Sequence, residues 1–221
     1  MNTTYHAGKL SLAIIHSMLI ALCILIIVPF ILLVSISFSN EQDIVQLGYS
    51  FLPRHFELTA YQFIFQSPKP ILSAYNVTIL STATGTFLSV LLMSLIAYPL
   101  SKLDLQGRKF ISFYIFFTMI FNGGLVPTYI LITEYLKLND TIWVFIFPTL
   151  INAWHIFLLR TFFSKLPESI VESALLDGAS EFRVFFTMIL PLSKPVLATV
   201  ALFGALMRWN DWFTAMLYIN N

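Results

Sequence analysis

Charged residues are scarce in this sequence: Asp, Glu, Lys and Arg together make up 10% of its 221 residues. A typical soluble domain carries about 25%. Hydrophobic residues reach 58% and include 22 Phe, which is more apolar surface than the remaining polar residues could cover in water. The composition therefore excludes a soluble globular protein and indicates a protein whose solvent is lipid.

Cysteine is nearly absent, and so are the sequence motifs of catalytic, nucleotide-binding and metal-binding sites. The single Cys23 lies in an apolar run, which excludes a disulfide framework or a cysteine-rich metal site. The sequence has no Gly-x-x-x-x-Gly-Lys-Ser/Thr phosphate loop, and no paired carboxylates, metal-ligand cluster or Ser/His/Asp arrangement stands out. We therefore expect no metal, no cofactor and no enzymatic activity. The net charge of +1 gives no reason to expect nucleic acid as a partner.

Long apolar segments are what the chain has instead. A membrane-spanning helix needs about 20 predominantly apolar residues, and five segments qualify, at about 10–38, 71–100, 110–133, 142–163 and 196–219. The first is too long for the apolar core of a signal peptide, and no small-x-small cleavage pattern follows it. The sequence thus predicts an all-α, polytopic membrane helical bundle with five spans.

Lysine and arginine positions predict how these spans are oriented. With a cytoplasmic N-terminus, the basic residues on the inside are Lys9, Lys102, Arg108, Lys109, Arg160, Lys165, Arg183 and Lys194. Those on the outside are Arg54, Lys69 and Lys137. This excess of inside charge follows the positive-inside rule. We therefore expect a multi-pass membrane protein whose N-terminus is cytoplasmic and whose fifth span ends outside.

Two connections between the spans are long enough to have structure of their own. In the outer one, residues 39–70, Thr59 and Gln62 fit a capping box, which predicts a short helix through Phe65. The inner one, residues 164–194, reads as helix, glycine turn, helix: Pro167 can open the first helix, and Gly178 can end it.

The second inner helix can be capped by Ser180 and ended by Pro191. Its apolar residues recur at helical spacing and form one predicted stripe, made of Phe182, Phe185, Phe186 and Ile189. Neither inner helix is long enough to cross a bilayer. The pair is therefore either a surface-lying or re-entrant connector, or a docking element for a cytoplasmic partner.

Polar residues inside the third and fifth segments are candidates for a transport path, because polar groups in a membrane usually face other helices or a cavity. Asn210 and Asp211 lie in the outer half of the fifth segment, where Arg208 could pair with Asp211. They either help to line an outer gate or form an interfacial cluster that sets the depth of the helix. Asn122, followed by two glycines and a proline, would break the third segment and produce either a pore bend or a packing kink.

The inner connection carries a family resemblance. Residues 172–180, Glu-Ser-Ala-Leu-Leu-Asp-Gly-Ala-Ser, with Leu-Pro-Leu at 190–192, resemble the EAA loop of ABC importer permeases. That pattern is EAA, three residues, Gly, nine residues and I-x-L-P. The spacing is intact, and two positions depart from it: Ser173 stands for an alanine and Met188 for an isoleucine.

Other motifs extend the resemblance over the chain. Ala-Tyr-Pro-Leu-Ser-Lys at 97–102 and Trp-Asn-Asp-Trp-Phe at 209–213 resemble the carbohydrate, MalG-like branch. Phe-Asn-Gly-Gly-Leu-Val-Pro at 121–127 resembles the LplC/YtcP-type subgroup, which is often linked to complex oligosaccharides. The resemblance implies the type-1 (MetI-like) permease fold, with an N-terminal span and outer loop at 1–71 and a permease domain at 72–221. The family normally has six spans, so we expect a C-terminally incomplete domain and an incomplete half-pore.

The resemblance also implies a function. The chain would form half of the pore of an ATP-driven importer for a sugar or oligosaccharide in the bacterial cell membrane. Its partners would be a second permease subunit, giving a heterodimer, together with a dimer of ATP-binding subunits and an extracellular substrate-binding protein. The residues that would couple the loop at 164–194 to the ATPase are Glu172, Ala174, Asp177, Gly178, Ala179, Phe182, Leu190 and Pro191.

Two other functions are compatible with a polytopic bundle. A self-contained channel or secondary transporter would explain the spans and the broken third segment, but it would not explain the EAA-like loop. A membrane enzyme would need a convergent set of acid, base or nucleophilic groups at one depth, and the sequence does not supply one.

Overall fold

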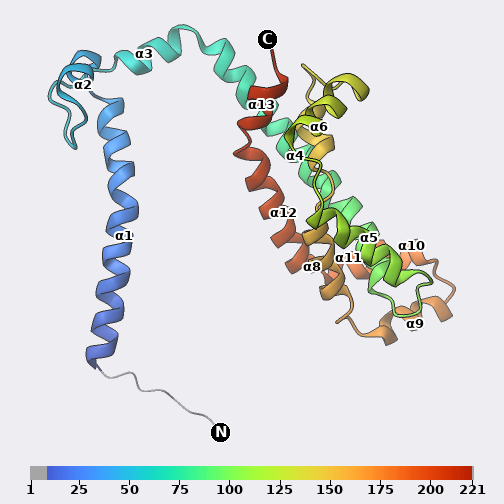
Figure 1. Ribbon diagram of the computed structural model, residues 1–221. Coiled ribbons are helices and arrows are strands. Elements are labelled where there is room, and N and C mark those ends of the chain that lie inside the picture. Colours follow the sequence, from blue (N-terminus) through green and yellow to red (C-terminus); the bar gives the residue numbers. More distant parts are fainter. Residues whose placement is uncertain (1–8, 221) are drawn as a thin grey trace. The chain divides into compact units, whose positions relative to one another are not determined.

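The computed structural model describes residues 9–220, and its regular elements in that range are helices (Figure 1). The chain divides into two compact units, Met1–Leu72 and Ser73–Asn221. The predicted all-α fold is confirmed.

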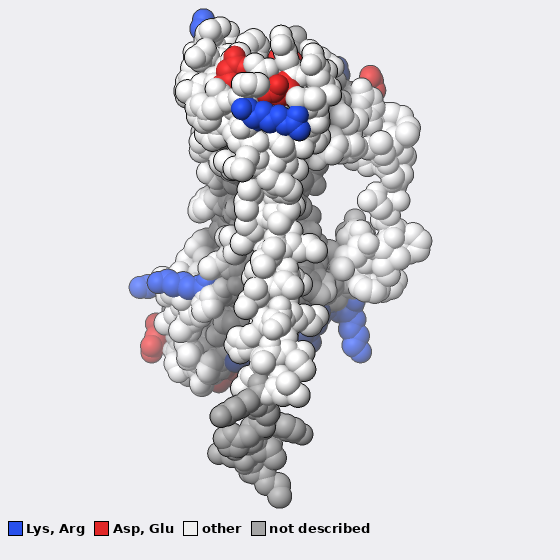
Figure 2. Space-filling view, turned by 90° about the vertical axis from the view of Figure 1, so that its left-hand side faces the viewer, with Lys and Arg blue, Asp and Glu red and all other residues white. Residues whose placement is uncertain are grey.

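The first unit contains α1 (Lys9–Ser37), α2 (Glu41–Leu47) and α3 (Thr59–Gln66). Helix α1 has 29 residues and is about 43 Å long at 1.5 Å per residue, enough to cross a bilayer core. Residues 10–37 of α1 include no Asp, Glu, Lys or Arg, whereas Figure 2 shows acidic and basic side chains around α2 and the loop after it. The exposed apolar side chains of α1 are those of a helix whose surroundings are lipid.

The second unit is built around α4 (Pro68–Ser101), which has 34 residues. The shorter helical elements that follow it are α5 (Arg108–Ile120), α6 (Leu125–Ile130), η1 (Leu131–Tyr135), α7 (Trp143–Ile146), η2 (Phe147–Thr149), α8 (Ala153–Phe163), α9 (Glu168–Leu176), α10 (Glu181–Val184), η3 (Phe185–Ile189), α11 (Leu190–Leu192), α12 (Lys194–Trp209) and α13 (Phe213–Tyr218). Helix α8 packs against both α5 and α12 (Figure 1).

The main core of this unit joins the long helices to the connector between α8 and α12. Its buried members from the long helices are Met93, Ala97, Tyr98, Leu100, Ile156, Leu159, Phe163, Val196 and Val200. Those from the connector are Ala174, Val184, Phe185 and Ile189. The connector is therefore packed into the bundle and is not a free loop.

Only two helices in the described range, α4 and α1 from Leu10 onward, are each long and apolar enough to cross a membrane unbroken. Three bent pairs pass the same test when each is taken as one span: α5 with α6 and η1, α7 and η2 with α8, and α10 to α11 with α12. Their bends are 109°, 55° and 81° respectively. The structure thus holds up to five crossings.

The bends correct two of the five predicted segments and agree with a third. The third segment breaks after Ile120, as the residues at 122–124 predicted, and Gly124 adopts φ +85°. The fourth, expected to be continuous from 142 to 163, is interrupted between Thr149 and Ala153. The fifth, expected from 196 to 219, is interrupted after Trp209 and resumes as α13 at Phe213; the Asp211 carboxylate accepts the Thr214 N–H at the start of the new helix.

Candidate functional site

The turn between α9 and α10 is the part of the connector that the sequence predicted best. Helix α9 ends in a Schellman motif: Ala179 donates its N–H to the Ala174 carbonyl, and Gly178 donates to the Leu175 carbonyl, each at 3.0 Å. Gly178 has φ +80°, a left-handed conformation that favours glycine. The N–H of Arg183 donates to the Ser180 hydroxyl at 3.3 Å, so Ser180 caps α10 as expected.

Replacing Gly178 with alanine is expected to loosen this turn by about 1 kcal/mol, because a Cβ disfavours the left-handed region. A Cβ there would meet no atom within 4 Å, so crowding plays no part. Amide hydrogen exchange over residues 174–182 should be faster in Gly178→Ala and less affected in Gly178→Asn, since asparagine tolerates this conformation. Equal exchange in the wild type and in Gly178→Ala would contradict this account of the turn.

The predicted apolar stripe on the second helix is only half correct. Phe185 is 1% exposed and Ile189 2%, whereas Phe182 is 71% exposed and Phe186 49%. The buried face consists of Val184, Phe185 and Ile189, so Val184 takes the place in the core that the predicted stripe gave to Phe182 and Phe186. The helical path also continues through Pro191 to Leu192, beyond the end that the proline predicted.

The residues predicted for ATPase coupling all lie on this connector, but they divide by exposure. Ala174 is 5% exposed, and Ala179 packs against the same core. Those exposed to the surroundings are Glu172, Asp177, Gly178, Phe182 and Pro191, while Leu190 is partly buried against the core. The loop thus uses its small and aliphatic residues to hold itself to the bundle and presents acidic and aromatic groups outward.

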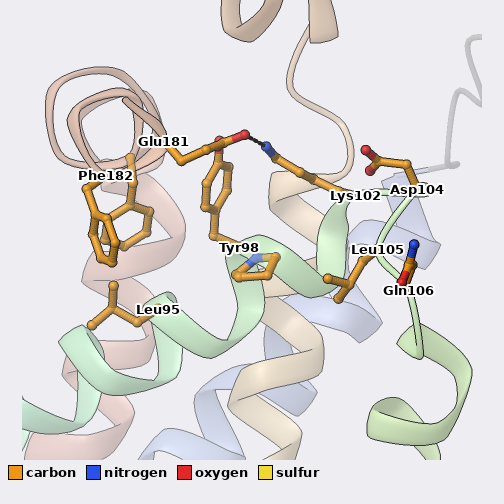
Figure 3. Close-up of a pocket in the computed structure, with 10 residues that line it drawn as sticks. Leu95, Tyr98, Lys102, Asp104, Leu105, Gln106, Glu181 and Phe182 are labelled. Carbon is orange, nitrogen blue, oxygen red and sulfur yellow. Dashed lines mark hydrogen bonds and ion pairs between the residues drawn. The ribbon is translucent and has the colours of Figure 1, made fainter. Parts of the chain in front are cut away.

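A polar link ties the second helix of the connector to the end of α4 (Figure 3). Glu181 accepts from Lys102 Nζ at 2.5 Å through one carboxylate oxygen and from the Tyr98 hydroxyl at 3.0 Å through the other. Burial acts to lower the pKa of the Lys102 ammonium, but Glu181 and Tyr98 outweigh it and raise that pKa. Lys102 therefore stays cationic. Sequence reasoning missed this link, because its two sides lie 79 residues apart.

Two hollows lie beside this link. One, of about 520 Å³, is bounded by α4, the segment after it and the start of α10, with Leu95, Leu105 and Phe182 among its lining residues (Figure 3). The other, of about 420 Å³, opens toward α9, where Val171, Glu172 and Leu175 line it. Tyr98, Lys102 and Glu181 line both hollows.

A buried arginine joins three helical elements deeper in the bundle. Arg208 of α12 is 5% exposed. Its guanidinium donates to the Ser89 hydroxyl at 2.5 Å, the Thr149 carbonyl at 2.7 Å and the Gly204 carbonyl at 3.2 Å. Thr149 stands where the fourth segment breaks, so Arg208 satisfies a carbonyl that the interrupted helix ladder leaves free.

The predicted pairing of Arg208 with Asp211 is wrong. Asp211 accepts instead from the N–H of Thr214 at 3.0 Å, and Arg208 points into the bundle. Glycine makes room for it: a Cβ at Gly85 would lie 2.6 Å from its Nε, and one at Gly204 would lie 3.2 Å from Nη1.

The three candidate gate residues make local hydrogen bonds. Asn210 donates to the Leu206 carbonyl at 2.8 Å at the end of α12, and Asn122 accepts from the Gly124 N–H at 2.9 Å between α5 and α6. With Asp211 at the start of α13, each of them marks the end or the beginning of a helix. The structure places Asn210 and Asp211 together and Asn122 in a different bent pair.

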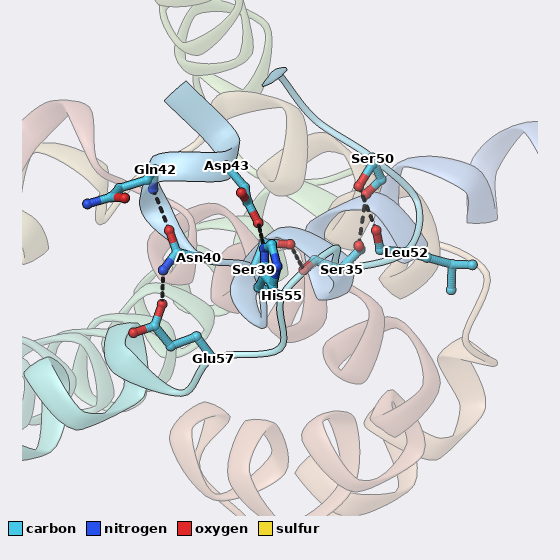
Figure 4. A network of polar contacts seen from close by, with 9 residues as sticks. All are labelled: Ser35, Ser39, Asn40, Gln42, Asp43, Ser50, Leu52, His55 and Glu57. Atoms are coloured by element: carbon cyan, nitrogen blue, oxygen red, sulfur yellow. Dashed lines mark hydrogen bonds and ion pairs between the residues drawn. The ribbon is translucent and has the colours of Figure 1, made fainter. Parts of the chain in front are cut away.

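The predicted outer loop of the first unit is held by a polar network (Figure 4). Asn40 caps α2 by accepting from the Gln42 N–H at 2.8 Å, and its amide donates to Glu57. The capping box predicted at Thr59 is wrong, although the helix it predicted is present as α3. The helix begins one residue earlier than the capping box requires, with Leu58 at the N-cap and Thr59 already inside α3. The Thr59 hydroxyl therefore accepts no backbone N–H of the helix and donates instead to the Glu57 carboxylate at 2.5 Å.

Residues 9–220 contain no group of three or more His, Cys, Asp or Glu that could hold a metal ion. No protein-family model matches the chain.

Proteins of similar sequence match most of the length of this chain. The polygalacturonan/rhamnogalacturonan transport system permease protein YtcP of Bacillus subtilis (strain 168) is 39% identical over 208 residues, which are 94% of this chain and 72% of that protein. LplC of the same strain is 41% identical over 195 residues, 88% of this chain, and the match spans 65% of the length of LplC. The trehalose/maltose transport system permease protein MalG of Thermococcus litoralis is 30% identical over 95% of this chain and 76% of its own length.

A solved structure agrees with these relatives. A chain in the crystal structure of a bacterial ABC transporter involved in the import of the acidic polysaccharide alginate matches with a TM-score of 0.86 and 31% identity. The match covers 100% of this chain and 78% of that one.

Proposed function

The chain belongs to the family of sugar ABC transporter permeases, and from this premise we propose that it forms half of a translocation pore for a sugar or an oligosaccharide. A separate ATP-binding subunit would hydrolyse ATP, in keeping with relatives that are transport permeases and not enzymes. The observation that supports coupling best is the connector at 164–194, whose exposed acidic and aromatic groups stand on a turn packed into the core.

The exposed face of the connector is the proposed contact with the ATP-binding subunit. Glu172 and Asp177 would bind polar or basic groups of that subunit, and Phe182 would enter an apolar recess, since a short helix suits a groove. The remaining coupling residues would keep this face in place: Ala174, Gly178 and Ala179 through the Schellman turn, and Leu190 and Pro191 by leading into α12.

The other partners follow from the family. A binding-protein-dependent importer needs an extracellular substrate-binding protein and two pore-forming subunits, and we propose that the second subunit here is a different permease. We also propose that 72–221 is the permease domain and that 1–71 is a peripheral span with an outer loop. Asn210, Asp211 and Asn122 would line the outer gate, because each stands at a helix break where backbone and side chain can reach a substrate.

The substrate proposed is an oligosaccharide. Two of the proteins that resemble the chain have polysaccharides in their descriptions, polygalacturonan/rhamnogalacturonan for YtcP and alginate for the solved transporter, whereas the Thermococcus relative has trehalose/maltose. Uptake of acidic and neutral oligosaccharides by the same vesicles would distinguish these classes.

The orientation that we propose for the spans places the connector in the cytoplasm. The basic residues of the second unit include Lys102 after α4, Arg108 and Lys109 at the start of α5, and Lys165 and Arg183 on the connector. These positions are those that the positive-inside rule favours for a cytoplasmic side. A single cysteine at exposed Asp177, in a Cys23→Ala background, should react with an impermeant maleimide only after the membrane is opened. A cysteine at Lys137 should react in intact cells, and labelling in the opposite order would contradict the proposed orientation.

Co-purification tests the proposed function as a whole. Expressed with ATP-binding and second permease subunits of a sugar importer from the same organism, the tagged chain should retain both in mild detergent and support ATPase activity in the membrane fraction. A chain that purifies folded but retains no ATP-binding subunit would refute the proposal.

A further inference from the structure

We propose that Lys102 and Glu181 form a positioning pair that transmits movement of the coupling turn to α4; this inference rests on the proposed function. Glu181 lies in the first turn of α10, three residues after Gly178, so it moves with the turn that would meet the ATP-binding subunit. Lys102 directly follows the last residue of α4. A contact between them joins the docking element to the longest helix of the described chain.

The link is fixed firmly on the α4 side. Tyr98, which donates to the second oxygen of Glu181, is 8% exposed. Its ring lies 5.4 Å from that of Phe185 and 6.5 Å from that of Phe163, and the Lys102 ammonium lies 5.0 Å from the centre of the same ring. The carboxylate of Glu181 therefore binds two donors of α4 and its end, and one of those donors belongs to the core.

The link adds a polar connection to the apolar packing that already joins the connector to α4. The hollows of about 520 Å³ and 420 Å³ both border Tyr98, Lys102 and Glu181, so the polar link crosses a loosely filled region. Among the described residues, this is the only ion pair that joins a lysine or arginine to a carboxylate. Displacement of α10 would therefore reach the end of α4 through these three side chains as well as through the shared core.

The path beyond Lys102 crosses the bilayer without interruption. Helix α4 has 34 residues, about 50 Å at 1.5 Å per residue, whereas the other helical segments of the second unit that could cross a membrane are bent pairs. A push on its end is therefore carried along one continuous helix, in which Pro99, three residues before Lys102, leaves one backbone hydrogen bond unmade. Helix α4 also contains Ser89, which accepts a hydrogen bond from Arg208. The same helix therefore contacts both the Lys102–Glu181 link and the buried arginine.

The test is the ratio of substrate transported to ATP hydrolysed by the complete transporter in proteoliposomes. Glu181→Gln and Lys102→Met should lower this ratio about fivefold or more, the lower range of coupling effects between sites, while ATPase activity persists. The exchanged pair, Lys102→Glu with Glu181→Lys, should recover most of the ratio. Tyr98→Phe, which keeps the ring and removes the hydroxyl, should lose less than either charge variant.

Lys109→Gln is the matched control, because Lys109 is an exposed cation at the start of α5 outside the link, and it should leave the ratio unchanged. Single variants that keep the wild-type ratio would overturn the inference. So would single variants that lose transport and ATPase activity in parallel and are not restored by the exchange. These outcomes arise with a wild type that transports, whereas a wild-type complex without ATP-driven uptake would refute the proposed function instead.

Discussion

Replacing Arg208 with leucine is expected to lower the free energy of unfolding by about 2–4 kcal/mol, because it removes three hydrogen bonds and leaves partners without donors away from water. The Thr149 carbonyl is the critical partner, since the break after it has no helix ladder to return to. The change should appear as a lower midpoint of thermal unfolding in detergent. Lys165→Leu, which removes an exposed cation, should shift the midpoint little.

The close approach of Gly85 to the Arg208 side chain allows a sharper test of the same contact. Gly85→Ala should destabilise the wild type, because its Cβ would lie 2.6 Å from Arg208 Nε. In the Arg208→Leu background the cost should be smaller, since the group that crowds the Cβ is gone. The two changes should therefore be non-additive, as contacting residues are. Strict additivity would show that Arg208 does not occupy the space that Gly85 leaves.

Reversing the charge of the exposed coupling face is expected to reduce transport about tenfold or more, because like charges facing each other across an interface cost several kcal/mol. Glu172→Arg with Asp177→Arg should abolish retention of the ATP-binding subunit. Both side chains are exposed, so the thermal midpoint of the chain alone should change little.

Glu134→Arg is the matched control for this reversal, since Glu134 is exposed in η1, far along the chain from the connector. It should leave both retention and uptake near the wild-type values. A reversed Glu172/Asp177 variant that still retains the ATP-binding subunit would show that the docking face lies elsewhere.

Features decided by neighbouring residues were predictable from the sequence. Gly178 and Ser180 define a turn whose geometry depends on residues within five positions, and Asn122 with the glycines after it breaks the third segment locally. The helical nature of the bundle follows from apolar segments of bilayer length. These inferences needed no knowledge of which helices meet.

Features decided by distant residues were not predictable. The partners of Arg208 include Ser89, 119 residues away. The sequence favoured Asp211 instead, because residues three apart lie on the same face of a helix. The break in the fourth segment follows Pro148 by two residues, but the proline does not say where the helix ends or that the free Thr149 carbonyl is satisfied by Arg208 of α12. Which phenylalanines of the connector face the core depends on distant partners as well, since Phe185 packs against Tyr98 of α4.

ATP-driven uptake of labelled oligosaccharide into proteoliposomes, carrying the chain with its second permease, ATP-binding and substrate-binding subunits, tests the central claim most directly. Uptake should require ATP and binding protein, and it should be lost when Glu172 and Asp177 are both changed to arginine. Uptake by the chain alone without ATP, or uptake that the doubly reversed variant retains in full, would contradict its assignment as a coupled pore subunit.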